Sequence, residues 1–434
     1  MAKSRDSFGS KLGAILVAAG STVGLGSIWR FPYIAGENGG GAFLLLYFVC
    51  ILILGIPIML AEFSIGYHTR KSPVYAYKQL SRRWTWLGYN SIIVSLLISG
   101  FYYIVSGWSL EYFFASIDGS LYSSGNFHAT FESFTSSWRE PFYTMLFILL
   151  THLIVARGVR GGLERMSNVM MPLLLAILVV MAVRSSSMSG AAAGYEFLFK
   201  PDFSKALTTK TIICAIGQAF FALSIGLGCM IAYSSYFKRG TNLTSTAFSV
   251  SLMTFAVALL SGVVIFPAVF SVSGLEPTAG PTLIFETLPY IFGEMANPRL
   301  WSSAFFLLVA MASLTSTISF HEVMTQYVEE FHDVPRRRAT IIVTILSAAA
   351  ASLCLWSSRL FDLFDMITAD VLMPLGGLFT AIFAGWVFDR KVFRHQLTRE
   401  GAHPARLFPL LRFLLRWVCP ILLGVTFLYN LAVA

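Results

Sequence analysis

Charged residues are scarce in this sequence: Asp, Glu, Lys and Arg make up 12% of its 434 residues, whereas hydrophobic residues make up 56%. Soluble domains carry about 25% charged residues, so the composition excludes an ordinary soluble protein. Apolar stretches of about the 20 residues that span a bilayer recur along the whole chain. We therefore predict an all-α polytopic membrane protein, with residues 1–434 forming a single transmembrane domain.

The apolar stretches predict eleven transmembrane helices. The first follows Lys3, Arg5 and Lys11, is too long for a signal-peptide core and runs into Pro32 without a small-residue cleavage site, so we expect it to be retained. The predicted spans are residues 12–35, 41–67, 87–117, 140–156, 164–183, 210–237, 245–272, 300–331, 338–356, 361–388 and 408–432.

Cysteine is also rare. All five cysteines lie within predicted spans and show no paired spacing, so we expect neither a disulfide framework nor a metal cluster. His152 and His321 have no metal-ligand or nucleophile partner at a recognisable spacing, which argues against an intramembrane enzyme.

Acidic residues are outnumbered, with 22 Asp and Glu against 31 Lys and Arg. Most of the basic residues lie in short segments on one side of the predicted spans, dispersed rather than clustered on one face. Such a bias sets the orientation of a membrane protein and does not indicate nucleic-acid binding. It predicts that the N-terminus lies in the cytoplasm and, for eleven spans, that the C-terminus lies outside; the membrane itself is expected to be a bacterial-type inner membrane.

Two matched pairs of glycines interrupt the first and sixth predicted spans. Gly24 and Gly26 are repeated as Gly226 and Gly228, 202 residues later. A single pair of glycines is consistent with close helix packing. Two glycine pairs at matched positions instead favour two helices with an opened backbone. The offset predicts a repeat of five helices, 11–183 and 210–388, with the second copy inverted because five is odd. The eleventh helix, 408–432, lies outside the repeat.

Several motifs resemble the neurotransmitter:sodium symporter family, which includes the bacterial leucine transporter. They are GSTVGLGSIWRFPY at 20–33, ENGGGAF at 37–43, RG at 157–158 with GLER at 162–165, QAFF at 218–221, SIGLG at 224–228 and SLTS at 313–316. The resemblance covers nearly the whole chain. It implies broken helices 1 and 6, an inverted 5+5 repeat and transport by alternating access.

The resemblance implies two sodium sites of unequal quality. The second site would use five matching positions, the carbonyls of Gly20, Val23 and Ala312 and the hydroxyls of Thr315 and Ser316, and a hard cation prefers such oxygen ligands. The first site is depleted, because shorter side chains or a methyl group stand where the family carries larger oxygen ligands. Its positions are Thr22, Ser27, Ala222 and Thr254. Ala258 stands at the position that holds serine in chloride-dependent members, which argues against chloride dependence.

The family's substrate pocket maps onto twelve positions of this chain. Leu25, Gly26 and Tyr103 would hold a carboxylate, and carbonyls of Thr22, Phe221 and Ala222 with the Ser224 hydroxyl would hold an amino group. The full set is Thr22, Gly24, Leu25, Gly26, Ser99, Tyr103, Phe221, Ala222, Ser224, Leu227, Ser316 and Phe320. No charged side chain is among them, which predicts a neutral, apolar amino acid.

Gates are implied by the same resemblance. Arg30 would pair with Asp365 on the outside and Arg5 with Glu330 on the inside, supported by Tyr236. Gly162 and Pro172, around the start of the fifth predicted span, match a family element that can unwind to admit water. The alternative is that Gly162 only begins the helix and Pro172 only kinks it. Asp370 departs from the pattern, and is either a solvated acid of the outer vestibule or a group for proton coupling or charge compensation.

We therefore predict a symporter that imports a neutral amino acid with sodium, through an intact second sodium site and a weakened first. Two alternatives stay open: a proton-driven or sodium-independent amino-acid carrier, and a non-transporting amino-acid sensor. The expected partners are a small-molecule amino acid, Na⁺ and the lipid bilayer. The sequence specifies neither the amino acid nor the oligomeric state.

Overall fold

The structure is a computed structural model that describes residues 7–203, 208–272, 284–398 and 406–433. Helices make up nearly all of it, and no strand occurs in these ranges. The all-helical prediction is confirmed in this part of the chain. Within the described ranges nine helices are long and apolar enough to cross a membrane, and a bent pair near the start makes up to ten.

The first predicted span is broken. Helix α1, Lys11–Thr22, ends at Val23, and the backbone becomes helical again through η1, Gly26–Arg30, and α2, Phe31–Glu37, at an angle of 55° to α1. The Val23 N–H still bonds to the Ala19 carbonyl, but its ψ of 71° leaves the helical path. The following carbonyls and N–H groups are therefore freed from regular helical pairing.

The sixth predicted span is also broken. Helix α12, Thr209–Ala222, and the short helix α13, Cys229–Ser234, are separated by six residues. Gly226 and Gly228 have φ of +84° and +76°, values that glycine adopts without steric cost. Because α12 is short and the break is long, this pair is not among the ten spans counted above. The count of eleven and the inverted 5+5 repeat stay predictions.

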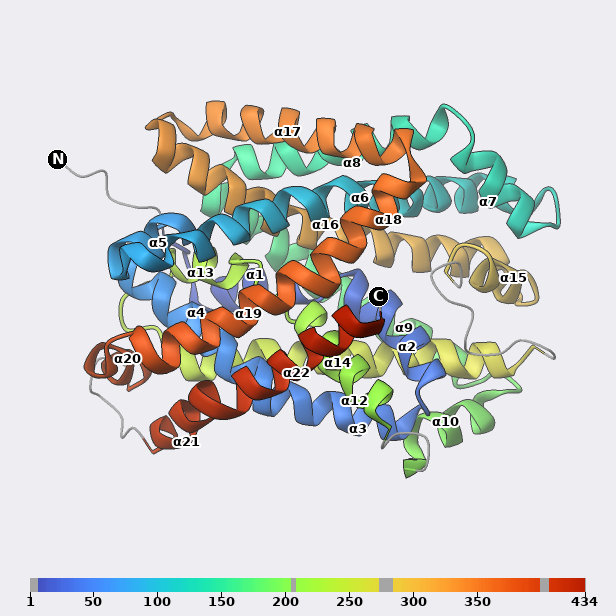
Figure 1. Cartoon of the computed structure of the whole chain (residues 1–434). Helices are drawn as coiled ribbons and strands as arrows, with labels where there is room; N and C mark the ends of the chain where they lie inside the picture. Colours follow the sequence, from blue (N-terminus) through green and yellow to red (C-terminus); the bar gives the residue numbers. More distant parts are fainter. Residues whose placement is uncertain (1–6, 204–207, 273–283, 399–405, 434) are drawn as a thin grey trace.

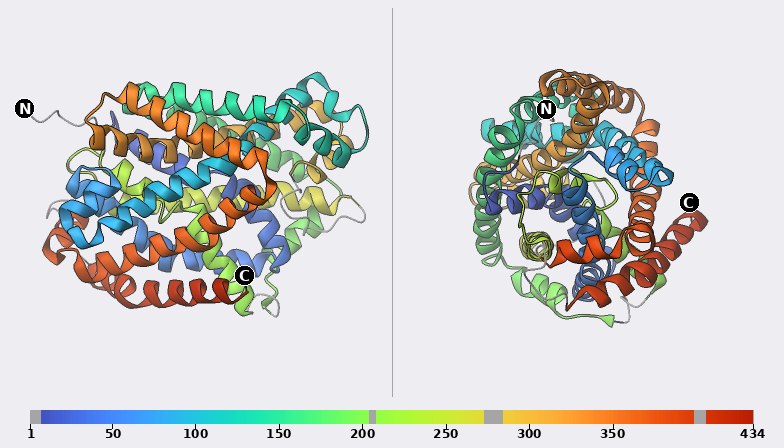
Figure 2. Two further views of the ribbon diagram at one scale, coloured as in Figure 1. Left: turned by 45° about the horizontal axis from the view of Figure 1, so that its top comes forward. Right: turned by 90° about the vertical axis from the view of Figure 1, so that its left-hand side faces the viewer.

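Long helices surround the two breaks (Figures 1 and 2). Helices α6, α8, α16 and α17 pack against one another along one edge of the bundle, and α22 packs on α19 and α12 at the opposite edge. The remaining elements of the described chain follow this order: α3 Gly41–Cys50, η2 Ile51–Gly55, α4 Ile56–Thr69, α5 Pro73–Leu80, η3 Arg82–Trp84, α6 Thr85–Asp118, η4 Ser120–Tyr122, α7 Phe127–Thr135, α8 Arg139–Ala156, η5 Val159–Glu164, α9 Arg165–Ser185, α10 Ala191–Phe199, α14 Leu243–Phe270, α15 Thr287–Gly293, α16 Pro298–His332, α17 Arg336–Trp356, α18 Ser358–Met366, η7 Ile367–Leu372, α19 Met373–Ile382, η8 Phe383–Val387, α20 Arg390–Leu397, α21 Phe408–Phe413, η9 Leu414–Val418 and α22 Cys419–Val433.

Candidate functional site

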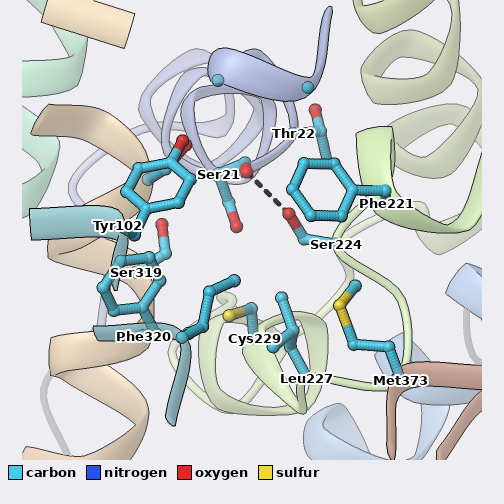
Figure 3. A pocket seen from close by; sticks show the side chains of 14 residues that line it. Ser21, Thr22, Tyr102, Phe221, Ser224, Leu227, Cys229, Ser319, Phe320 and Met373 are labelled. Atoms are coloured by element: carbon cyan, nitrogen blue, oxygen red, sulfur yellow. Dashed lines mark hydrogen bonds between the residues drawn. The ribbon is translucent and has the colours of Figure 1, made fainter. Parts of the chain in front are cut away.

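A small cavity lies where the two helix breaks meet (Figure 3). Its volume is about 20 Å³. The Ser224 hydroxyl, at a residue with φ of +50°, donates to the Ser21 carbonyl at 2.7 Å and joins the two breaks directly. The lining residues are Ser21, Thr22, Gly24, Gly26, Ile98, Tyr102, Phe221, Ser224, Leu227, Cys229, Ser316, Ser319, Phe320 and Met373, none of them charged.

The N–H of Leu25 forms one side of an anion cradle. It lies just before η1 and donates to the hydroxyl of Tyr102 at 3.1 Å. Gly24 allows this approach, because a Cβ at that position would overlap the Ser316 hydroxyl and lie 2.9 Å from the Tyr102 oxygen. An N–H group at the start of a helical segment, beside a phenol hydroxyl, is suited to a carboxylate.

Helix α6 presents different residues to the cavity from those predicted. Tyr102 and Ile98 line it, whereas Tyr103 and Ser99 do not. The Tyr103 hydroxyl lies 3.1 Å from His321 Nδ1, and the Ser99 hydroxyl donates to the Leu96 carbonyl. The prediction was displaced by one residue, and one residue turns a helical side chain by about 100°.

Most of the other predicted pocket residues do line the cavity: Thr22, Gly24, Gly26, Phe221, Ser224, Leu227, Ser316 and Phe320. Leu25 instead lines a second cavity, which is described below. Ala222 is buried at the end of α12 and lines neither cavity. The sequence prediction missed Ser21, Ile98, Tyr102, Cys229, Ser319 and Met373. Ser21 and Cys229 flank the two breaks, whereas the others come from α6, α16 and α19, whose cavity-facing sides were not recognisable from spacing alone.

Glu62 is a further polar residue that the sequence prediction missed. It is buried in α4, and its carboxylate accepts a hydrogen bond from the Gly226 N–H at 2.9 Å. The Glu62 carboxylate thus holds the opened backbone of the second break in place. An acidic residue in the middle of an apolar span was the available signal, since such residues are costly in a membrane.

The predicted second sodium site is assembled from α1 and α16. A Cβ on Gly20 would lie 3.2 Å from the Thr315 Cβ, so the helices touch at this position. The hydroxyls of Thr315 and Ser316 donate to the Ala312 carbonyl at 2.9 and 3.3 Å, which leaves their lone pairs available. With the backbone at Val23 opened, these oxygens are of the kind that a hard cation requires.

The positions of the predicted first sodium site also converge. The hydroxyls of Thr22 and Thr254 lie 2.6 Å apart, and the Ser27 hydroxyl donates to the Thr22 carbonyl at 3.3 Å. Ala222, at the end of α12, has no side-chain oxygen to add. The hydroxyls here bond to one another and to the backbone, and the group lacks any carboxylate or amide side chain.

A second cavity of about 300 Å³ lies next to the first, on the side of Arg30 and Asp365, and is called the outer cavity below. Tyr102 and Phe221 line both cavities and therefore separate them. The Arg30 guanidinium lies 4.6 Å from the centre of the Phe221 ring. Within the described residues no ion pair joins Arg30 to Asp365, so the expected outer pair is apart in this structure.

Asp370 belongs to the same group of charges. It lies in η7, is half-buried, and is close enough to Arg30 and Asp365 for their charges to act on one another. Both of these neighbours line the outer cavity, while Asp370 does not. The placement matches an acid beside the outer vestibule, and its role stays a prediction.

Only one member of the predicted inner pair, Glu330, can be placed. Arg5 lies outside the described residues. The Glu330 carboxylate accepts hydrogen bonds from the N–H and hydroxyl of Ser72, the latter at 2.6 Å. These contacts hold the end of α16 against the start of α5.

A buried ion pair lies deeper on the same side. Glu322 is fully buried; it pairs with Arg336 and accepts a hydrogen bond from the Tyr236 hydroxyl at 2.7 Å. Arg336 also donates to the Val155 carbonyl at 2.9 Å. The network joins α16, α17, α8 and the segment after α13. Sequence reasoning identified Tyr236 but missed Glu322, which an acid within an apolar span should have signalled.

Helix 5 begins with the π-helical stretch η5, which contains Gly162, and Pro172 lies inside α9. A Cβ on Gly162 would overlap the Ile154 carbonyl, so the segment needs glycine for close packing. The Glu164 carboxylate accepts hydrogen bonds from the Gly9 N–H at 2.6 Å and from the N–H and hydroxyl of Ser10 at 3.0 Å. The start of helix 1 is thus attached to the stretch that contains Gly162.

Comparison with known proteins places the chain in a family. The profile of the "Sodium:neurotransmitter symporter family" matches residues 5–125 and 122–434. An uncharacterized sodium-dependent transporter, YhdH of Bacillus subtilis, is 35% identical over 96% of each chain. An uncharacterized sodium-dependent transporter of Haemophilus influenzae is 34% identical over 99% of each chain.

The solved structures include a close match in fold. The crystal structure of MhsT in complex with L-phenylalanine superposes with a TM-score of 0.90 at 37% identity, covering 98% of this chain and 100% of MhsT. The resemblance found in the sequence motifs is confirmed. The chain belongs to the sodium:neurotransmitter symporter family and is a sodium-coupled transporter of the membrane.

Proposed function

We propose that this protein imports a neutral, apolar amino acid together with sodium by alternating access. The observation that carries the proposal is the cavity at the two breaks, whose lining has no charged side chain and includes Tyr102, the hydroxyl of which accepts a hydrogen bond from the Leu25 N–H. A ligand there must bring its own carboxylate and amino group. The bound L-phenylalanine of MhsT, a structure of the same fold, supports an amino acid.

The amino group would have partners from both breaks. The carbonyls of Thr22 and Phe221 lie at the C-terminal ends of α1 and α12, and the Ser224 hydroxyl joins the two breaks by donating to the Ser21 carbonyl. Carbonyl ends of helices favour a cation. The remaining surface, from Leu227, Phe320 and Met373, is apolar, which favours an apolar side chain over a charged one.

The cavity is too small to admit an amino acid without movement of its lining. About 20 Å³ is close to the room needed for one water molecule, so lining side chains must move to admit an amino acid. Because Tyr102 and Phe221 separate the cavity from the 300 Å³ outer cavity, these two rings must part for entry from that side. The closed cytoplasmic network at Glu322 and Arg336 is the complementary barrier.

We further propose that coupling uses mainly the second sodium site, with the first weakened and chloride not required. The carbonyls near Gly20 and Val23 and the hydroxyls of Thr315 and Ser316 support the second site, whereas Ala222 removes a ligand from the first. The basic-residue bias supports a bacterial-type inner membrane with the N-terminus in the cytoplasm.

The proposal is tested by binding of all twenty standard amino acids to purified protein, with sodium and with sodium replaced by choline. We expect tight binding of one or a few neutral, apolar amino acids, only when sodium is present. Equal binding without sodium would favour a sodium-independent or proton-driven carrier. Binding without uptake by proteoliposomes would favour an amino-acid sensor.

A further inference from the structure

Three arginines gather where the tenth and eleventh predicted spans meet. Arg390 begins α20, directly after the span that ends at Val387, and Arg412 and Arg416 lie one helical turn apart near the start of the last span. Residues four apart share one face of a helix. Arg412 is close enough to both Arg390 and Arg416 for their like charges to repel it. Figure 1 shows α20 and α21 at the end of the bundle where α5 also lies.

Arg416 is held in place by an aromatic ring. Its guanidinium carbon lies 3.9 Å from the centre of the Trp386 ring, and its backbone carbonyl accepts the Trp386 indole N–H at 3.3 Å. The contact fixes the tenth span to the eleventh. The Nε–H of Arg416 is nevertheless buried, without a hydrogen-bond acceptor in the described residues.

The cluster has no acidic counterpart among the residues that the structure describes. None of the three arginines lies within 4.0 Å of an Asp or Glu oxygen there. Like charges packed together at the edge of a low-dielectric bilayer are costly unless an anion compensates them. The buried donor on Arg416 is the kind of group that such an anion would accept from.

The surroundings identify the class of anion. Large apolar side chains surround the cluster on the outer surface: Trp386 is 49% exposed, Trp417 51% and Phe413 54%. Exposed aromatic residues of this kind lie at the boundary between lipid headgroups and hydrocarbon. A ligand at this place meets both guanidinium groups and an apolar surface, which a soluble anion does not match and a phospholipid does.

We propose that Arg390, Arg412 and Arg416 bind the phosphate of an anionic phospholipid, whose acyl chains lie along Trp386, Phe413 and Trp417. Basic pockets between membrane helices on the cytoplasmic side bind anionic lipid headgroups in this way. With the proposed orientation, the cluster faces the cytoplasmic leaflet. The site is separate from the amino-acid cavity, so its occupancy does not depend on the identity of the substrate.

The test is native mass spectrometry of the delipidated full-length protein, titrated with phosphatidylglycerol or with phosphatidylcholine of the same acyl chains. We expect phosphatidylglycerol to bind more tightly. Since each arginine near the headgroups contributes on the order of fivefold, R412Q/R416Q should weaken phosphatidylglycerol binding by about 30-fold and leave phosphatidylcholine unchanged. R412K/R416K, which keeps both charges, should retain most of the preference.

The matched control is K391Q/R394Q, which removes two exposed charges outside the cluster from the same connection and should weaken binding much less than R412Q/R416Q does. Equal losses in R412Q/R416Q and in the control would overturn the proposal, as would equal binding of the two lipids to the unmodified protein. Displacement of the lipid by inorganic phosphate alone would also overturn it, because the site would then belong to a soluble anion. Should the double variant fail to fold, the single R412Q variant carries the same test with a loss of about fivefold.

Discussion

Thr315→Ala should raise the sodium concentration needed for half-maximal amino-acid binding by about 10- to 100-fold. The substitution removes the hydroxyl of a residue whose Cβ lies beside Gly20, and an interaction with a charged group contributes about 1.5 to 3 kcal/mol. Affinity for the amino acid at saturating sodium should change much less. Binding measured as a function of sodium concentration separates the two effects.

Two variants of the same helix control for packing. Thr315→Ser keeps the hydroxyl and should retain near-normal sodium dependence. Thr317→Ala removes a buried hydroxyl that bonds to Thr151 at 2.9 Å on another face of α16, and should leave the sodium response unchanged. A sodium response in Thr315→Ala like that of the unmodified protein would place the main ion elsewhere.

Tyr102→Phe should weaken amino-acid binding by about 10- to 100-fold. The variant removes the hydroxyl that meets the Leu25 N–H, and with it the hydrogen bond that we propose this hydroxyl makes to the charged carboxylate of the substrate. The ring remains, so the partition between the two cavities is preserved. Binding of the preferred amino acid at saturating sodium measures the loss.

The neighbouring tyrosine provides a sharp control. Tyr103 is equally buried, and its hydroxyl lies against His321 rather than in the cavity. Tyr103→Phe should therefore change substrate affinity by less than about threefold and lower stability by about 1 kcal/mol. A larger loss of affinity in Tyr103→Phe than in Tyr102→Phe would restore the assignment made from the sequence.

This pair also shows why the sequence could place the site but not its exact lining. Adjacent tyrosines in a uniformly apolar span give no periodic signal that distinguishes the face toward the cavity. The breaks were easier to predict, because Gly24, Gly26, Gly226 and Gly228 interrupt two otherwise apolar helices. Their conformations agree with that prediction, since Gly226 and Gly228 adopt positive φ.

Long-range charge pairs were the least predictable part of the site. Glu322 and Arg336 are joined only because α16 and α17 form an antiparallel pair, and neither residue carries a local motif. Glu62 and Glu164 likewise bond to backbone groups of distant segments. For Glu62 and Glu322 the position of an acid within an apolar span was the signal present in the sequence, and it indicates a function without naming a partner.

The two predicted gates differ, and the difference gives an expected order for the proposed transport cycle. On one side Arg30 stacks on Phe221 with Asp365 apart, next to a 300 Å³ cavity. On the other side Glu322, Arg336 and Tyr236 are joined. Closure on one side with loosened contacts on the other is what alternating access requires of a single state. Entry from the Arg30 side is therefore the expected first step.

The number of charges that cross the membrane with each amino acid tests the coupling most directly. The ratio is measured in proteoliposomes from the reversal potential of sodium-driven uptake. If only the second sodium site is intact, one sodium ion should accompany each neutral amino acid, so one positive charge should cross per molecule. Thr315→Ala should reduce that current at sodium concentrations that just saturate the unmodified protein, and higher sodium should restore it. A ratio of two charges per amino acid, or uptake that persists without sodium, would contradict the account.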